Sequence, residues 1–137
     1  MNKIFRGIIV LLLIFAGSAA YAQTNAAPPT KQEIKKFKRG NFEYITGLYK
    51  GVVIKRTRRR QIEVDPATHR KAVLKVKWIS DSEFWLTFIS DTQTSKVPVK
   101  GMVIRVKILS VTADAYTCHW DCDKCGPGGT DSFRKIK

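Results

Sequence analysis

Hydrophobic and polar residues alternate along most of the chain from residue 40 onward, which is the pattern of half-buried β-strands. The clearest case is 74–78, where Leu74, Val76 and Trp78 share one face and lysines occupy the other. In segment 62–64 the same rule places Ile62 and Val64 toward the core. The remaining alternating segments are 42–44, 52–54, 84–88, 102–108 and 116–120.

Short polar segments connect these strands, and no long amphipathic helix lies between them, which excludes a parallel α/β fold. We therefore predict an all-β domain over 40–125, an antiparallel meander of about seven strands that curls into a small barrel or sandwich. Residues 126–137 are rich in Gly and Pro at their start and are expected to form a tail that adds an edge strand or frays.

The residues before the strands predict one short helix. Thr30 followed by Glu33 matches a capping box, and Ile34 and Phe37 would then share one face of a turn or two that ends before Gly40. Residues 23–39 are otherwise expected to be a flexible basic leader.

The first 22 residues have the pattern of a cleavable secretory signal peptide. Lys3 and Arg6 make its start positive, residues 8–16 are wholly apolar, and 20–22 read Ala-Tyr-Ala, with small residues where a signal peptidase cuts. The apolar run is shorter than the ~20 residues needed to span a bilayer, which argues against a retained anchor. We expect an exported protein, periplasmic or extracellular, whose mature chain begins at or near Gln23.

The mature chain is strongly basic. Of the 25 Lys and Arg residues, Lys3 and Arg6 belong to the signal peptide, so 23 basic side chains stand against 11 acidic ones and the net charge is +12. Such a charge favours contact with an anionic envelope polymer or a membrane surface. In an exported protein we do not expect nucleic acid to be the physiological partner. The alternative is a solvated charged surface that binds nothing in particular.

The densest basic segment lies at the expected turn of a hairpin and is the candidate anion-binding site. Arginine there offers forked donors to phosphate or carboxylate groups, and Trp85 or Tyr49 could add a stacking surface if the fold brings it near. A basic turn also protects an exposed strand pair from edge-to-edge aggregation, which is the alternative reading. The site comprises Lys55, Arg56, Arg58, Arg59 and Arg60.

The three cysteines, Cys118, Cys122 and Cys125, form the one local cluster whose side chains could form a disulfide, bind a metal or react. In an oxidising compartment they predict one disulfide and one free thiol, and their spacing does not choose among the three pairings. A zinc site made by the three thiolates and a neighbouring His or Asp is the alternative. Against zinc, His119 should point to the opposite face of its strand from Cys118. A redox role for the last two cysteines lacks a βαβ setting, and neither a metal nor another cofactor is favoured.

No arrangement of residues indicates an enzyme. The chain has two histidines, His69 in a polar loop and His119, and it contains no nucleophile elbow, metalloprotease helix, phosphate loop or paired-carboxylate motif. We therefore expect a non-catalytic protein whose basic surface binds an anionic polymer, a lipid or a partner protein. The alternative is a lipocalin-like carrier that encloses a small apolar ligand between Trp78, Phe84 and Phe88; an interior filled by side chains would exclude it.

Several segments resemble a family of small exported bacterial proteins, some of them lipoproteins. They are Gly40-Asn41-Phe42-Glu43-Tyr44, Ile54-Lys55-Arg56-Thr57, Gln61-Ile62-Glu63, Val76-Lys77-Trp78-Ile79-Ser80-Asp81 and Leu86-Thr87. The resemblance implies the same succession of strands and carries no catalytic residue. Some members bear a DNA topoisomerase IV label, which looks like a transferred annotation because a chain of this size has no room for a topoisomerase. The segment 118–125 departs from the family pattern.

Overall fold

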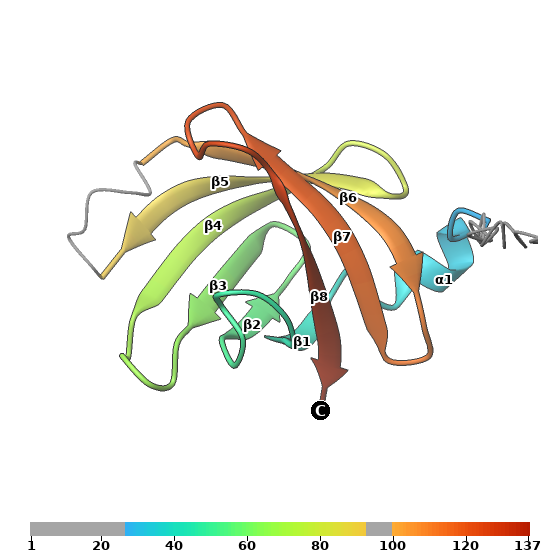
Figure 1. The fold of residues 1–137 in the computed structure, drawn as a ribbon, viewed down its shortest axis with the longest axis horizontal. Coiled ribbons are helices and arrows are strands. Elements are labelled where there is room, and N and C mark those ends of the chain that lie inside the picture. Colours follow the sequence, from blue (N-terminus) through green and yellow to red (C-terminus); the bar gives the residue numbers. More distant parts are fainter. Residues whose placement is uncertain (1–26, 93–99) are drawn as a thin grey trace, which may run out of the picture.

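The computed structural model describes residues 27–92 and 100–137, and in this part of the chain eight antiparallel strands form a closed barrel (Figure 1). Each strand pairs with its neighbours in sequence, and β8 pairs with β1. The predicted all-β antiparallel barrel is therefore confirmed, with eight strands instead of about seven. The strands are β1 (Gly40–Tyr44), β2 (Val53–Arg56), β3 (Arg60–Val64), β4 (Lys71–Trp78), β5 (Glu83–Asp91), β6 (Val103–Val111), β7 (Ala115–Cys122) and β8 (Gly129–Ile136).

The last strand corrects the expectation of a frayed tail or an edge strand. In β8, Asp131 lies opposite Cys118 of β7, and Phe133 lies opposite both Tyr116 of β7 and Tyr44 of β1. β8 thus has a partner on each side and closes the ring, because its backbone donors and acceptors are used by both β1 and β7. The predicted signal peptide, residues 1–22, lies outside the described residues.

The inner faces of most strands are those that the alternation predicts. Leu74 and Val76 of β4 and Phe84 and Leu86 of β5 are buried in the core. Strand β3 is the exception, and the prediction for Ile62 and Val64 was wrong. Gln61 is the buried residue, with 1% of its surface exposed, whereas Val64 is 37% exposed.

A short helix, α1 (Lys31–Lys35), closes one end of the barrel, and the predicted capping box between Thr30 and Glu33 is present. Ile34 and Phe37 are fully buried in the core. The Lys36 ammonium holds this segment in place by donating to the carbonyl oxygens of Thr112 and Ala113 at 2.8 and 2.7 Å. None of the described residues belongs to a helix with the length and apolar character needed to cross a bilayer.

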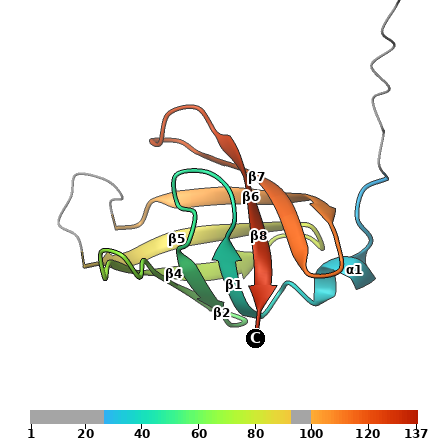
Figure 2. The same ribbon diagram turned by 60° about the horizontal axis from the view of Figure 1, so that its bottom comes forward.

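None of the described residues closes the other end of the barrel. In Figure 2 the β1–β2 and β7–β8 connections point away from α1 and from the C-terminus. We call the end with α1 the closed end and the opposite end the mouth. The turn between β2 and β3 and the C-terminal residue of β8 lie at the closed end, because Gly40 pairs with Arg56 and Asn41 with Ile136.

Candidate functional site: a cavity inside the barrel

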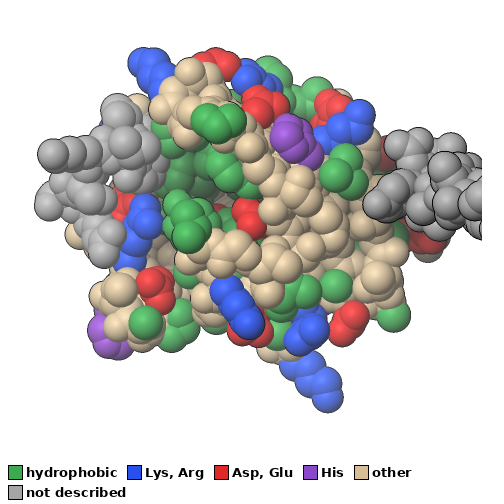
Figure 3. Space-filling model, in the orientation of Figure 1, with side chains coloured by type: hydrophobic (Ala, Val, Ile, Leu, Met, Phe, Trp, Pro, Cys, Tyr) green, Lys and Arg blue, Asp and Glu red, His purple; other side chains and the backbone are tan. Residues whose placement is uncertain are grey.

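The barrel contains a cavity of about 520 Å³ that opens at the mouth. Its entrance is formed by the β1–β2 and β3–β4 connections, together with Met102 and Cys125. The space-filling view shows a hollow bordered by hydrophobic side chains, with an acidic side chain at its edge (Figure 3). Ligand pockets in proteins commonly have volumes of about 300–1,000 Å³, so this cavity is large enough for a small organic molecule.

One wall of the cavity is apolar and comes from the middle of the sheet. Ala72 of β4 has the smallest side chain in this wall, which leaves space in front of its strand. Hydrocarbon and aromatic surface of this kind favours an apolar ligand, because binding removes the apolar surfaces of the wall and of the ligand from water. The wall consists of Ala72, Leu86, Phe88, Ile104 and Val106.

The floor of the cavity is formed around the Arg56 side chain, which is only 3% exposed. Its Nε donates to Gln61 Oε1 at 2.6 Å, its Nη1 to the Phe37 carbonyl at 3.2 Å and its Nη2 to Tyr116 Oη at 2.9 Å. The guanidinium also lies over the ring of Phe84, 4.6 Å from the ring centroid. No described carboxylate forms an ion pair with Arg56, so its direct contacts are with neutral oxygens and ring faces.

A polar strip continues from Arg56 along the second wall. Gln61 Nε2 donates to Glu63 Oε1 at 2.7 Å, and Tyr44 Oη donates to the same oxygen at 3.4 Å. Burial raises the pKa of Glu63, against the opposing effects of the Gln61 hydrogen bond and the Arg56 charge. Burial also raises the pKa of Tyr44 well above its usual value, and the nearby Glu63 carboxylate adds to that rise. Gln61 therefore links a buried cation to a partly buried carboxyl group.

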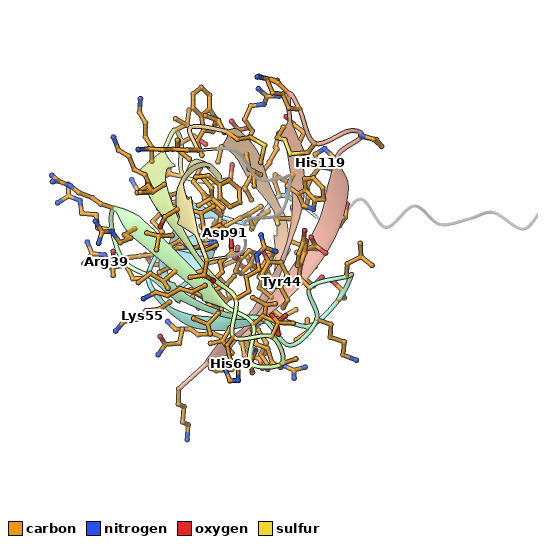
Figure 4. All side chains as sticks on the ribbon, turned by 90° about the vertical axis from the view of Figure 1, so that its left-hand side faces the viewer. Arg39, Tyr44, Lys55, His69, Asp91 and His119 are labelled. Atoms are coloured by element: carbon orange, nitrogen blue, oxygen red, sulfur yellow. A yellow bond between two sulfur atoms is a disulfide. The ribbon has the colours of Figure 1, made fainter. Side chains whose placement is uncertain are left out.

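Asp131 also lines the polar side of the cavity, and Asp91 lies opposite Ala72 near the mouth. Trp120 Nε1 donates to Asp131 Oδ2 at 2.8 Å across β7 and β8. Near the mouth, Arg70 Nε donates to both oxygens of Asp91 at 3.1 and 3.0 Å. Figure 4 shows Tyr44 and Asp91 within the ring of strands and His69 outside it. The cavity thus offers an apolar wall facing a wall that carries both donors and acceptors.

The structure divides the predicted anion-binding site. The side chain of Arg56 points into the barrel, whereas Lys55 and the three arginines at 58–60 are exposed on the outside. Of the two aromatic residues considered as stacking partners, Trp85 lies on the outer face opposite Lys77, whereas Tyr49 lies at the mouth, away from the arginines at 58–60. Arg56 is therefore a cavity residue and does not belong to the surface cluster.

The cysteines form a disulfide and a buried thiol. Cys122 and Cys125 lie at disulfide distance beside the mouth, and Cys118 is free and faces the cavity. Burial raises the pKa of the Cys118 thiol to about 12, so the thiol stays protonated at neutral pH. His119 is exposed on the opposite face, as the alternation predicts. Within residues 27–92 and 100–137, no group of three or more His, Cys, Asp or Glu side chains is placed to hold a metal ion.

Comparison of the chain with models of protein families, with curated proteins and with solved structures found no match. The family resemblance drawn from the sequence motifs therefore stays a prediction. The sequence analysis placed Arg56 in the surface anion-binding site, not in a cavity, and it did not predict Gln61 or Glu63 as site residues. For Arg56 a signal existed, because it continues the inward positions Val52 and Ile54 at intervals of two.

Proposed function

We propose that this protein is an exported, non-catalytic carrier that binds a small organic ligand inside the barrel. The observation that carries the proposal is the open cavity of about 520 Å³. A barrel of eight strands has an interior that side chains can just fill or that can hold one small ligand. Here bulky side chains fill the closed end, and the described residues leave a cavity in the half toward the mouth.

The two walls indicate what kind of ligand fits. The apolar wall suits a hydrocarbon or aromatic body, whose burial supplies most of the binding free energy. The strip formed by Tyr44, Glu63 and Gln61 suits a polar substituent that both donates and accepts hydrogen bonds. A ligand without such a substituent would keep water from these groups and leave their remaining hydrogen-bonding capacity unused, so we propose an amphipathic ligand, more polar than the purely apolar one expected from the sequence.

The cavity groups favour binding over turnover. Cys118, the free thiol that faces the cavity, is held protonated by burial, and both histidines lie outside the barrel. The Arg56, Gln61, Glu63 and Tyr44 side chains are bonded to one another, which fixes their positions for recognition.

The test is to fill the cavity. Ala72→Phe places a ring in front of the apolar wall, and Val73→Phe, the next residue on the same strand with its side chain on the opposite face, is the matched control. We expect the wild type and Val73→Phe to bind the fluorescent probe anilinonaphthalene sulfonate (ANS) with a saturable signal, and Ala72→Phe to lose it.

Circular dichroism and thermal melting establish that each variant is folded. A folded Ala72→Phe that binds ANS as the wild type does would refute the cavity as the site. Should Ala72→Phe fail to fold, Ile104→Trp, from the same wall, provides the second variant, with the same expectation. As a separate measurement, we expect native mass spectrometry of the wild-type protein, purified from its own host, to show a bound organic molecule.

A further inference from the structure

One side of the barrel exterior carries a dense group of exposed cations, which we call the basic face. Lys55 of β2, Arg60 of β3 and Lys75 of β4 point outward from three adjacent strands. Figure 4 shows Lys55 and Arg39 projecting to the same side, together with other nitrogen-tipped side chains. The basic face comprises Lys55, Arg58, Arg59, Arg60, Lys75 and Lys77.

Nothing in the described part of the protein neutralises this face. The ion pairs among the described residues involve other cations, such as Lys38 with Asp81 and Arg105 with Asp121. Arg60 also lies directly opposite Lys75 in the β3–β4 pair. Like charges in directly opposed positions destabilise a sheet, so the fold maintains this arrangement at some cost in stability.

Protection of a strand edge does not explain the basic face. Strands β2, β3 and β4 are each paired on both sides, because the barrel is closed. A closed barrel has no edge onto which a second chain could add a strand, so charges are not needed to prevent it. The alternative reading of the arginine-rich turn therefore fails for this fold.

We propose that the basic face docks the protein on an anionic lipid bilayer. The cations are spread over three neighbouring strands and the β2–β3 turn, which matches a surface of many separate anionic headgroups. Exposed apolar side chains adjoin them: Trp85, 39% exposed, lies opposite Lys77, and Ile79, 44% exposed, follows the end of β4. An amphipathic tryptophan beside lysines and arginines is suited to the boundary between water and lipid.

Docking in this way leaves the cavity accessible. The β2–β3 turn lies at the closed end, and the cavity opens at the other end. The carrier would therefore be held at a membrane while its mouth remains free to exchange ligand. Lipid docking does not depend on the cavity, so it can be tested whatever the outcome of the ANS experiment.

The experiment measures binding of the full mature protein to vesicles by co-sedimentation. The vesicles contain three parts phosphatidylcholine to one part phosphatidylglycerol, and pure phosphatidylcholine vesicles serve as the neutral comparison. The test variant carries Arg58→Gln, Arg60→Gln and Lys75→Gln. The matched control carries Lys50→Gln, Lys100→Gln and Lys124→Gln, three exposed lysines outside the basic face, so both variants have the same net charge.

We expect the wild type to bind the anionic vesicles, to release them at high salt and not to bind the neutral ones. Each cation removed from a docked surface weakens partitioning about fivefold, so the test variant should bind about a hundredfold more weakly. The control variant should bind as the wild type does. The test variant should melt at the same or a higher temperature, because the opposition of Arg60 and Lys75 is relieved.

Three results would overturn the proposal. Equal losses in the test and control variants would show that only net charge matters. Equal binding of the wild type to neutral and anionic vesicles would remove the electrostatic basis. Tighter binding to duplex DNA than to vesicles at the same salt concentration, lost in the test variant alone, would assign the basic face to nucleic acid instead.

Discussion

Arg56 ties the closed end of the barrel together, and replacing it tests whether that end is held by a buried charge. Its guanidinium joins Phe37, which follows α1, to Gln61 on β3 and Tyr116 on β7. Arg56→Met keeps a long side chain and removes all three hydrogen bonds. Lys55→Met is the matched control, because Lys55 precedes it on the same strand and is exposed on the outside.

The expected loss follows from two opposing contributions. Hydrogen bonds to a charged group contribute about 1.5–3 kcal/mol each, and three such bonds are lost. Against this, the variant no longer has a guanidinium to remove from water on folding, which offsets the loss of stability by several kcal/mol. We expect a net loss of about 3 kcal/mol in the free energy of unfolding, a large share of the roughly 5–15 kcal/mol typical of a small domain.

Urea unfolding followed by circular dichroism measures the difference. Lys55→Met should stay within about 0.5 kcal/mol of the wild type. Tyr116→Phe removes one of the three bonds and should lose about 1.5–3 kcal/mol. The double variant Arg56→Met, Tyr116→Phe should lose less than the sum of the two, because the hydroxyl no longer has its partner. An Arg56→Met protein as stable as Lys55→Met would refute the assignment of the closed end to this network.

Two further predictions concern the polar strip and the segment 31–37 that closes one end of the barrel, which we call the plug. Burial raises the pKa of Glu63 above its usual 4.5, so the folded state favours the protonated carboxyl group. The stability that the protonated group contributes is therefore lost as the pH rises from 4.5 through the raised pKa. Glu63→Gln should therefore gain stability relative to the wild type over that pH window in urea titrations and hold a constant advantage above it; a difference independent of pH would contradict this. Phe37→Ala should lose about 3–5 kcal/mol of unfolding free energy, because it empties a fully buried ring site, whereas the exposed Lys35→Ala should change little. A small effect of Phe37→Ala would mean that the plug does not contribute to the core.

The strand pattern was predictable because a barrel with an apolar interior produces alternation in each strand separately. The same rule failed in β3, where it assigned Ile62 and Val64 to the core. Arg56 fixes the correct assignment. It continues the inward positions of β2, and residues 57–60 then turn the chain so that Gln61 lies directly opposite Arg56. Residues opposite one another in a pair share a face, so Gln61, and with it Glu63, must point inward.

Closure of the barrel was beyond sequence reasoning. The pairing of β8 with β1 joins segments from the two ends of the domain, and local alternation carries no information about such a contact. β8 itself has few apolar residues, and its inward position at Asp131 is acidic. The cavity follows from closure, so its existence could be considered from the sequence only as an alternative.

The position of the last strand has a practical consequence for attaching the protein to anything else. Because Ile136 pairs with Asn41, the C-terminal residue emerges at the closed end (Figure 2). A fusion domain, label or sensor surface linked there would leave the mouth facing solution, which suits measurements of ligand uptake. The same linkage would crowd the β2–β3 turn and its arginines, so lipid docking should be measured on protein with an unmodified C-terminus.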